Sequence, residues 1–161
     1  MIIASFNYLN KTPVEKKKVK IDETKIEEKS SSSNIIQNVK YASKDIRGNE
    51  YIITAIEGEI DLNNSNIIFL KGVEAKIILN NQNKIFISSE YGKYNINNFD
   101  TIFNKNILIN YLQNNIKGEY LDFSLQRNSM IISDDVVFSD SNNVLKTDVV
   151  EIDIKTKNTK F

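Results

Sequence analysis

Four segments of the chain repeat one pattern at a spacing of about 30 residues. They span residues 53–62, 87–96, 116–125 and 145–154. Each begins with an apolar, a polar and a small or polar residue and ends with alternating apolar and polar residues, as in a strand with one buried face. Such a repeat indicates an architecture that stacks one unit, because a single unit cannot bury its apolar face alone. We therefore expect function to reside in an extended surface or groove.

Each repeat changes phase in its middle. In the first repeat, Ile53 and Ala55 have odd numbers whereas Ile60 and Leu62 have even ones, so a flat strand would direct the two pairs to opposite faces. Four such breaks at equivalent places favour strands that cross the corner of a two-sheet sandwich or jelly roll. The residues at the break are Gly58, Gly92, Leu121 and Val150.

Turn-forming clusters of Asn, Asp and Ser separate further apolar stretches. We expect additional strands at residues 67–70, 75–79, 101–103, 107–112, 130–132 and 136–138, and a first hairpin that pairs residues 38–43 with 51–54. The predicted fold is all-β: a twisted antiparallel β-jelly roll, or two-sheet sandwich, built from repeated hairpins over residues 35–161.

The N-terminal part differs in composition. Residues 10–34 contain runs of Lys, Glu and Ser with few apolar residues, which predicts a disordered, charged tether. Residues 1–9 are mostly apolar and too short to span a bilayer. Two interpretations stay open: an ordinary apolar start, or the exit end of an N-terminal membrane anchor. The tether that follows favours the second interpretation, since an anchor needs a flexible spacer.

Catalysis has little support in this sequence. The 161 residues contain no histidine and no cysteine, which removes the usual general base, the thiol nucleophile and the commonest metal ligand. Acidic residues alternate with apolar ones as on a solvated strand face, so we predict no enzyme, no cofactor and no metal site. The acidic pairs considered for glycoside hydrolysis are Glu57 with Glu59, Glu119 with Asp122, and Asp134 with Asp135.

The charge balance argues against a nucleic-acid partner. The chain has 21 basic and 21 acidic residues, and its basic residues do not alternate with aromatic ones along any one strand face. Nothing in the overall charge attracts the whole molecule to nucleic acid or to anionic membranes.

Apolar residues at matching positions of the repeats and of the strands between them form a continuous apolar lane. Two interpretations of this lane stay open: an ordinary closed core, or an elongated trough for long acyl chains, which need apolar surface and no catalytic group. The residues assigned to the lane are Ile60, Leu62, Ile77, Leu79, Tyr94, Ile96, Ile109, Phe123, Leu125, Phe138, Ile152 and Ile154.

Several of these segments resemble the periplasmic domain of the LptC family, in the LptA/LptC/OstA-like superfamily. The resemblance is carried by residues 38–41, 48–55, 57–61 and 89–94 and extends over the chain from residue 35. It implies a V-shaped β-jelly roll with the acyl chains of lipopolysaccharide held between the sheets, and a periplasmic location attached to the inner membrane. The domain would receive lipopolysaccharide from an inner-membrane ABC transporter and pass it to the periplasmic bridge.

The same resemblance implies two protein partners that pair with the edge strands. LptF, which with LptB and LptG forms the transporter, would contact the N-terminal edge, and LptA the C-terminal edge. The residues assigned to these edges are Val39 and Tyr41, and Val149, Glu151 and Asp153.

Two features depart from the family pattern. We expect the anchor to be incomplete in this chain, and the chain stops after the closing strand of the fourth repeat, where the family continues with further strands. Two alternatives remain open: a soluble bridge subunit similar to LptA or OstA, and a structural β-repeat surface protein without lipid cargo.

Overall fold

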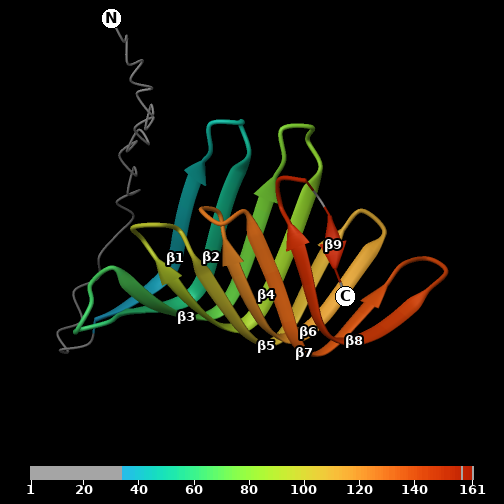
Figure 1. Ribbon diagram of the computed structural model, residues 1–161. Coiled ribbons are helices and arrows are strands. Elements are labelled where there is room, and N and C mark those ends of the chain that lie inside the picture. Colours follow the sequence, from blue (N-terminus) through green and yellow to red (C-terminus); the bar gives the residue numbers. More distant parts are fainter. Residues whose placement is uncertain (1–33, 157, 161) are drawn as a thin grey trace, which may run out of the picture.

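In residues 34–156 and 158–160, a single antiparallel sheet makes up the regular structure. The computed structural model describes residues 34–156 and 158–160, and nine strands in this part follow one another in chain order, each antiparallel to the next (Figure 1). The predictions for residues 1–9 and 10–33 lie outside the described residues. The strands are β1 (Ile35–Lys44), β2 (Glu50–Ile60), β3 (Ile67–Ile78), β4 (Lys84–Asn95), β5 (Thr101–Tyr111), β6 (Asn114–Ser124), β7 (Ser129–Ser139), β8 (Val144–Asp153) and β9 (Thr159–Lys160).

The predicted all-β class is confirmed, and the four repeats correspond to β2, β4, β6 and β8. The first hairpin is also confirmed, since Tyr41 pairs with Ile53 and Ser43 with Tyr51. The segments between the repeats differ from the prediction: each pair of short strands is one long strand, namely β3, β5 and β7. The described strands therefore form one continuous sheet that is not closed into a barrel.

A line of irregular pairing crosses this sheet from β1 to β8. Between β1 and β4 the ladders omit single pairs, and from β4 to β8 the register shifts at every pair of strands. Bulges of this kind bend strands and increase their twist. We call this line the bend; it comprises Asn38, Ile56, Gly72, Glu90, Lys105, Asn106, Glu119, Asp134, Asp135 and Asp148.

Odd-numbered strands adopt left-handed backbone conformations at the bend. The φ angles are 55° at Asn38, 62° at Gly72, and 65° and 55° at Asp134 and Asp135. Gly has no Cβ to clash in this region, and Asn and Asp tolerate it better than most residues. The composition of the bend, except for Lys105 with a φ of 69°, thus suits the sharp change of direction there.

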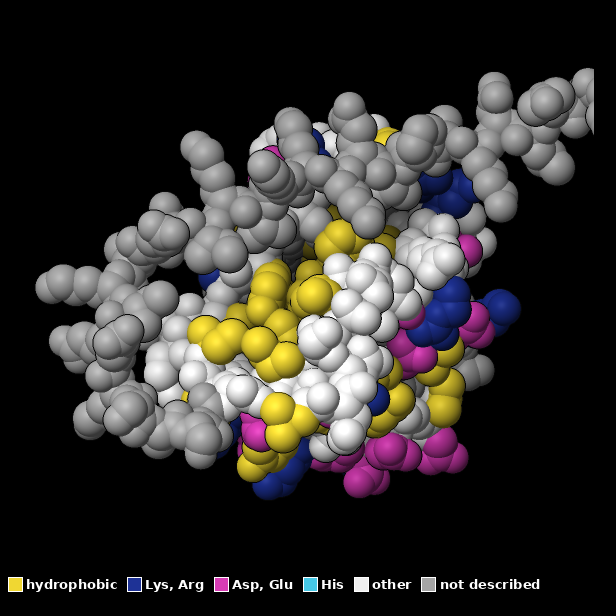
Figure 2. Space-filling view, turned by 90° about the vertical axis from the view of Figure 1, so that its left-hand side faces the viewer, with side chains coloured by type: hydrophobic (Ala, Val, Ile, Leu, Met, Phe, Trp, Pro, Cys, Tyr) yellow, Lys and Arg dark blue, Asp and Glu magenta, His cyan; other side chains and the backbone are white. Residues whose placement is uncertain are grey.

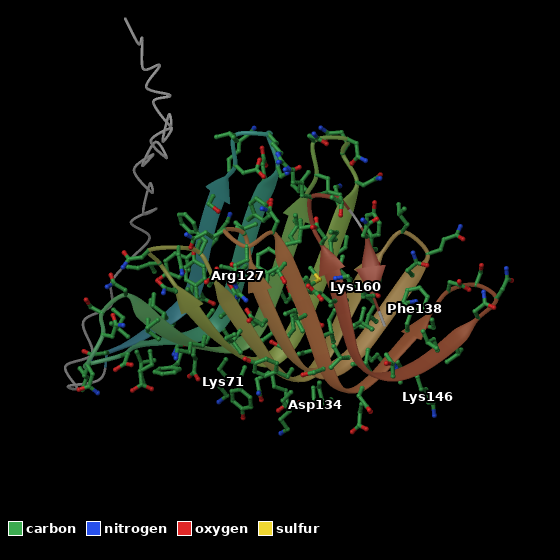
Figure 3. The ribbon with its side chains drawn as sticks, viewed as in Figure 1. Lys71, Arg127, Asp134, Phe138, Lys146 and Lys160 are labelled. Carbon is green, nitrogen blue, oxygen red and sulfur yellow. The ribbon has the colours of Figure 1, made fainter. Side chains whose placement is uncertain are left out.

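The bend divides the sheet into two arms that face each other. Arm A contains residues 39–44, 50–55, 73–78, 84–89, 107–111, 114–118, 136–139 and 144–147. Arm B contains residues 35–37, 57–60, 67–71, 91–95, 101–104, 120–124, 129–133 and 149–153. The ribbon folds over at the bend, and Lys71, Asp134 and Lys146 extend from its underside, away from the space between the arms (Figures 1 and 3).

The phase break in the sequence marks a buried row on arm B. Gly58, Gly92, Leu121 and Val150 occupy this row, each two residues beyond the bend, so their predicted equivalence is confirmed. The row continues through the strands between them, and all its members from β2 to β8 are buried. Its order across the sheet is Gly58, Leu70, Gly92, Phe103, Leu121, Ile132 and Val150.

Two glycines allow the arms to approach each other beside the bend. A Cβ on Gly58 would lie 2.7 Å from Cγ2 of Val39 on arm A. A Cβ on Gly118 would lie 2.7 Å from Cγ2 of Ile132 on arm B. Both distances are shorter than a carbon–carbon contact allows, so these positions are glycine because the opposite arm occupies the space.

Candidate functional site

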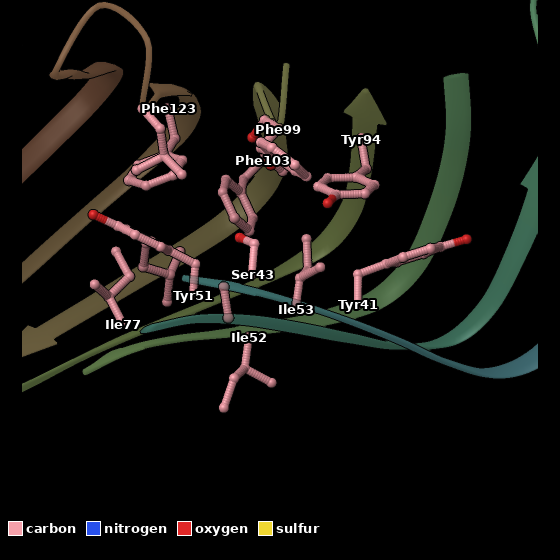
Figure 4. Close-up of a pocket in the computed structure, with 14 residues that line it drawn as sticks. Tyr41, Ser43, Tyr51, Ile52, Ile53, Ile77, Tyr94, Phe99, Phe103 and Phe123 are labelled. Atoms are coloured by element: carbon pink, nitrogen blue, oxygen red, sulfur yellow. Dashed lines mark hydrogen bonds between the residues drawn. The ribbon is translucent and has the colours of Figure 1, made fainter. Parts of the chain in front are cut away.

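The inner faces of the two arms enclose a narrow apolar slot. Side chains of β1 and β2 on arm A face aromatic side chains of β4, β5, β6 and the turn before β5 (Figure 4). A cavity of about 30 Å³, room for about one water molecule, remains between them. The side chains labelled on the two sides are Tyr41, Ser43, Tyr51, Ile53 and Ile77 on arm A, and Tyr94, Phe99, Phe103 and Phe123 opposite them.

Two aromatic contacts join the arms across the slot. The rings of Tyr41 and Tyr94 are stacked, with centroids 4.9 Å apart and an interplanar angle of 30°. The rings of Tyr51 and Phe123 are tilted by 51°, with centroids 6.2 Å apart. Each contact holds a strand near the first edge of the sheet against a strand from its middle, so the slot is closed by aromatic packing.

Burial of the slot changes the ionisation of its tyrosines. Desolvation raises the pKa of Tyr94 to about 12, and the neighbouring Tyr41 adds to this effect by electrostatic repulsion. Desolvation also raises the pKa of Tyr41. These hydroxyls therefore stay neutral at physiological pH, and the slot presents no charge from them to a ligand.

A hydrogen-bond network supports Tyr51 at the mouth of the slot. The Tyr51 hydroxyl donates to Oδ2 of Asp45 at 3.0 Å, and Nδ2 of Asn49 donates to the same oxygen at 2.7 Å. Oδ1 of Asn49 accepts from the backbone N–H of Asn80 at 2.9 Å, which joins the β1–β2 turn to the β3–β4 turn. The network fixes the Tyr51 ring between the arms.

Ten of the twelve residues assigned to the apolar lane lie in or against the core. Five of them are buried: Ile77, Leu79, Tyr94, Ile109 and Phe123. Five more are partly buried and pack against the core: Ile60, Leu125, Phe138, Ile152 and Ile154. Four of the ten line the slot itself: Ile77, Tyr94, Phe123 and Leu125.

The assignment of Leu62 and Ile96 to the interior is wrong. Their exposed fractions are 85% and 39%, because β2 ends at Ile60 and β4 at Asn95. The side chain of Asp61 accepts a hydrogen bond from the N–H of Asn63, and that of Asn95 from the N–H of Asn97, both at 2.9 Å. These turns begin one residue before the apolar position and rotate it out of the lane.

Several residues that line the slot were not predicted from the sequence. Tyr51 shares the parity of Ile53 and could have been found by extending the alternation backward. Phe99 has a φ of 63° and lies in a turn, and no periodicity identifies such a residue as inward-facing. The others are Ser43, Ile52, Ile53, Ala75, Ile87, Thr101 and Phe103; the side chain of Ile52 points away from the slot (Figure 4).

The assigned edge residues divide into two groups. On β1, Val39 is buried and Tyr41 lines the slot, so both side chains point between the arms although they belong to the first strand of the sheet. On β8, Val149 and Glu151 are exposed and Asp153 is half-buried. The short strand β9 pairs with Glu151 and Ile152, which leaves the edge of residues 144–150 unpaired in the described part of the chain.

The acidic pairs lie away from the slot. Glu57 forms an ion pair with Lys71 at 3.5 Å, and Asp122 one with Arg127 at 2.7 Å. Oε2 of Glu119 accepts from the N–H of Asn106 at 3.0 Å, and Asp134 and Asp135 occupy the bend. Among the described residues, no group of three or more His, Cys, Asp or Glu side chains could hold a metal ion.

Hydrophobic side chains also reach the surface at one side of the slot. Seen from the left of Figure 1, they gather at the centre of the molecule and are framed by uncharged polar atoms (Figure 2).

No helix in residues 34–156 and 158–160 has the length and apolarity needed to cross a membrane. The chain matches no model of a known protein family and no curated protein.

Proposed function

We propose that this bent sheet is a jelly roll of the LptC type, which binds lipopolysaccharide with its acyl chains between the two arms. One observation carries the proposal: Tyr41 and Tyr51 of arm A meet Tyr94 and Phe123 of arm B across an apolar slot. Apolar side chains from six successive strands, β1 to β6, converge on the slot. A long acyl chain needs this kind of surface.

Acyl chains enter this slot only when the arms separate, because the cavity is about 30 Å³ in the closed form. Separating the two aromatic contacts costs about 0.5–1.5 kcal/mol for each pair beyond the area exposed. Each buried methylene of an incoming chain contributes about 0.8 kcal/mol. The acyl chain covers again the apolar surface that the separating arms expose, so, relative to a chain in water, a few methylene groups offset the loss of the two aromatic pairs.

The edges of the sheet suit transfer to further subunits. A partner strand that pairs with an edge continues both arms, and hence the slot, into the next domain. On the proposed function, LptF of the transporter with LptG pairs with β1, and LptA pairs with residues 144–150 of β8. The location implied is the periplasm, with attachment to the inner membrane. The domain itself carries out no reaction and needs no cofactor.

Site-specific photocrosslinking tests this proposal. A photoreactive amino acid at Tyr41, inside the slot, should crosslink to lipopolysaccharide, whereas the same amino acid at Phe69, exposed on the outside of arm B, should not. Phe123→Arg should abolish crosslinking from position 41 because a guanidinium between the arms opposes entry of hydrocarbon. Crosslinking of equal strength from positions 41 and 69, or crosslinking that persists in Phe123→Arg, would contradict the proposal. Circular dichroism verifies that each variant is folded.

A further inference from the structure

The outer face of arm A is strongly basic although the chain as a whole is neutral. Cross-strand neighbours share a face of a sheet, so the register identifies the outward rows of arm A. Ile52, a member of one of these rows, points away from the slot (Figure 4). The charged residues in the rows are six lysines and two glutamates: Lys40, Lys44, Lys76, Lys84, Lys117, Lys146, Glu50 and Glu74.

Most of these lysines are available to a partner. Lys44 forms an ion pair with Glu50 at 3.2 Å, and within residues 34–156 and 158–160 the other five lysines form none. The ammonium of Lys76 lies 5.8 Å from the ring centroid of Phe86, which is 46% exposed. Arm A thus presents cationic groups together with an exposed aromatic side chain.

The bend carries the opposite charge. Its acidic residues outnumber its only lysine, Lys105, by five to one: Glu90, Glu119, Asp134, Asp135 and Asp148. The charge of the molecule is therefore divided between a basic arm A and an acidic bend. The balance of 21 basic and 21 acidic residues in the sequence conceals this division.

The hairpin turns at the end of arm A carry exposed aliphatic side chains. Ile46 in the β1–β2 turn is 97% exposed, and Leu112 and Val144, beside the β5–β6 and β7–β8 turns, are each 68% exposed. Figure 1 shows the β1–β2 and β3–β4 turns at the top and the β5–β6 and β7–β8 turns at the right. Exposed apolar residues therefore occur at three of the four turns at the free end of arm A, and the β3–β4 turn carries only polar residues at positions 80–83.

We infer that the outer face and hairpin turns of arm A dock on an anionic lipid bilayer. Lysines near an anionic membrane surface strengthen binding by about five-fold each. Exposed aliphatic and aromatic side chains insert between lipid headgroups. A nucleic acid offers no such layer for them to enter. The inference goes beyond the proposed function, since it needs no cargo in the slot.

Cosedimentation of the full chain with lipid vesicles tests the inference. The probes are vesicles of phosphatidylcholine alone and of an equal mixture with phosphatidylglycerol, at low and high salt. Lys117→Gln with Lys146→Gln should weaken binding to the mixed vesicles by at least about ten-fold. Its matched control, Lys93→Gln on arm B with Lys160→Gln on β9, should change binding by less than about two-fold.

A second pair of variants tests insertion of the turns. Ile46→Ser with Leu112→Ser should weaken binding to the mixed vesicles by at least about ten-fold, and the control Leu62→Ser with Ile96→Ser, in the turns of arm B, should have little effect. All variants retain residues 1–33, so differences between them arise from the substituted positions. Each variant should show the wild-type circular dichroism spectrum.

Three results would overturn the inference. The first is equal binding to neutral and anionic vesicles, or none to either. The second is an equal loss of binding in the arm A variants and their controls. The third is self-association without vesicles that the lysine variants abolish, which would make the acidic bend of a second copy the partner. None of these results bears on crosslinking from position 41, so the two proposals fail independently.

Discussion

The ring of Tyr51 in β2 lies 6.2 Å from the ring of Phe123 in β6, although three strands separate β2 from β6 in the sheet. This contact is possible because the bend folds the sheet onto itself. It joins the hydrogen-bond network at Asp45 to the centre of the slot through one side chain. The closed form of the slot therefore depends on a small number of contacts that mutation can remove individually.

Phe123→Ala should lower the free energy of unfolding by about 3–5 kcal/mol, because a buried aromatic side chain is lost and a cavity remains. The side chain is 6% exposed. Phe86→Ala, at a position that is 46% exposed on the outside, should cost less than about 1.5 kcal/mol. Urea unfolding followed by circular dichroism measures both. Equal losses would show that Phe123 is not held between the arms.

Gly58→Ala should lower the free energy of unfolding by about 1–3 kcal/mol, because its new Cβ would lie 2.7 Å from Cγ2 of Val39. Val39→Ala removes that methyl group and creates a small cavity of its own. In the double variant each change relieves the other, so the combined loss should be smaller than the sum of the two single losses. Additive losses in this double-mutant cycle would exclude the predicted contact between the arms.

Asp45 should make stability depend on pH in the acid range. Burial alone would raise the pKa of its carboxyl group, but hydrogen bonds from Asn49, Tyr51 and the N–H of Arg47 outweigh burial and lower it. A folded-state pKa below the unfolded value gives stability that is present above about pH 4 and lost as the pH falls. The effect is less than about 1 kcal/mol because the group is only partly buried and solvent screens its interactions.

Asp45→Asn tests this dependence. The difference in unfolding free energy between wild type and variant should be largest at neutral pH and should shrink as the pH falls below about 4. Tyr51→Phe retains the carboxylate and removes one of its donors, so its effect should be intermediate. A difference that stays constant over this range would mean that the network does not stabilise the ionised carboxylate.

Tyr94 should make the fold sensitive to alkali. Burial raises its pKa to about 12, so the neutral phenol is favoured in the folded state. The resulting stability is fully present below about pH 10 and is lost as the pH rises towards 12. An absorbance titration of tyrosinate should show a late-ionising group that Tyr94→Phe lacks. Tyr41→Phe should shift that group to lower pH, since Tyr41 contributes to the raised pKa; no shift would argue against coupling across the slot.

The strands and the phase break were accessible from sequence because both depend on neighbours in the chain. Alternation of apolar and polar residues identified β2, β4, β6 and β8, and the change of parity within each repeat identified the row that contains Gly58 and Val150. At Leu62 and Ile96 the predicted alternation extends beyond the ends of β2 and β4. The hydrogen bonds of an Asp or Asn side chain end a strand one residue earlier than hydrophobicity suggests.

The apolar lane was only partly predictable. Ten of its assigned residues lie in or against the core, but alternation does not show which of them face the slot. Phe99 reaches the slot from a turn, and its left-handed backbone conformation does not follow the strand alternation from which inward-facing residues are predicted. Contacts between arms join residues far apart in the chain, and the sequence pattern within one strand contains no information on them.

The sequence by itself determined an all-β chain of repeated bent strands, because side-chain alternation and turn chemistry act over a few residues. Only the tertiary structure decided that all nine strands share one sheet, that this sheet folds into two facing arms, and that lysines gather on arm A while acids gather at the bend. These properties follow from cross-strand register. Register is a long-range relationship, fixed when hydrogen bonds and burial on both arms are satisfied together.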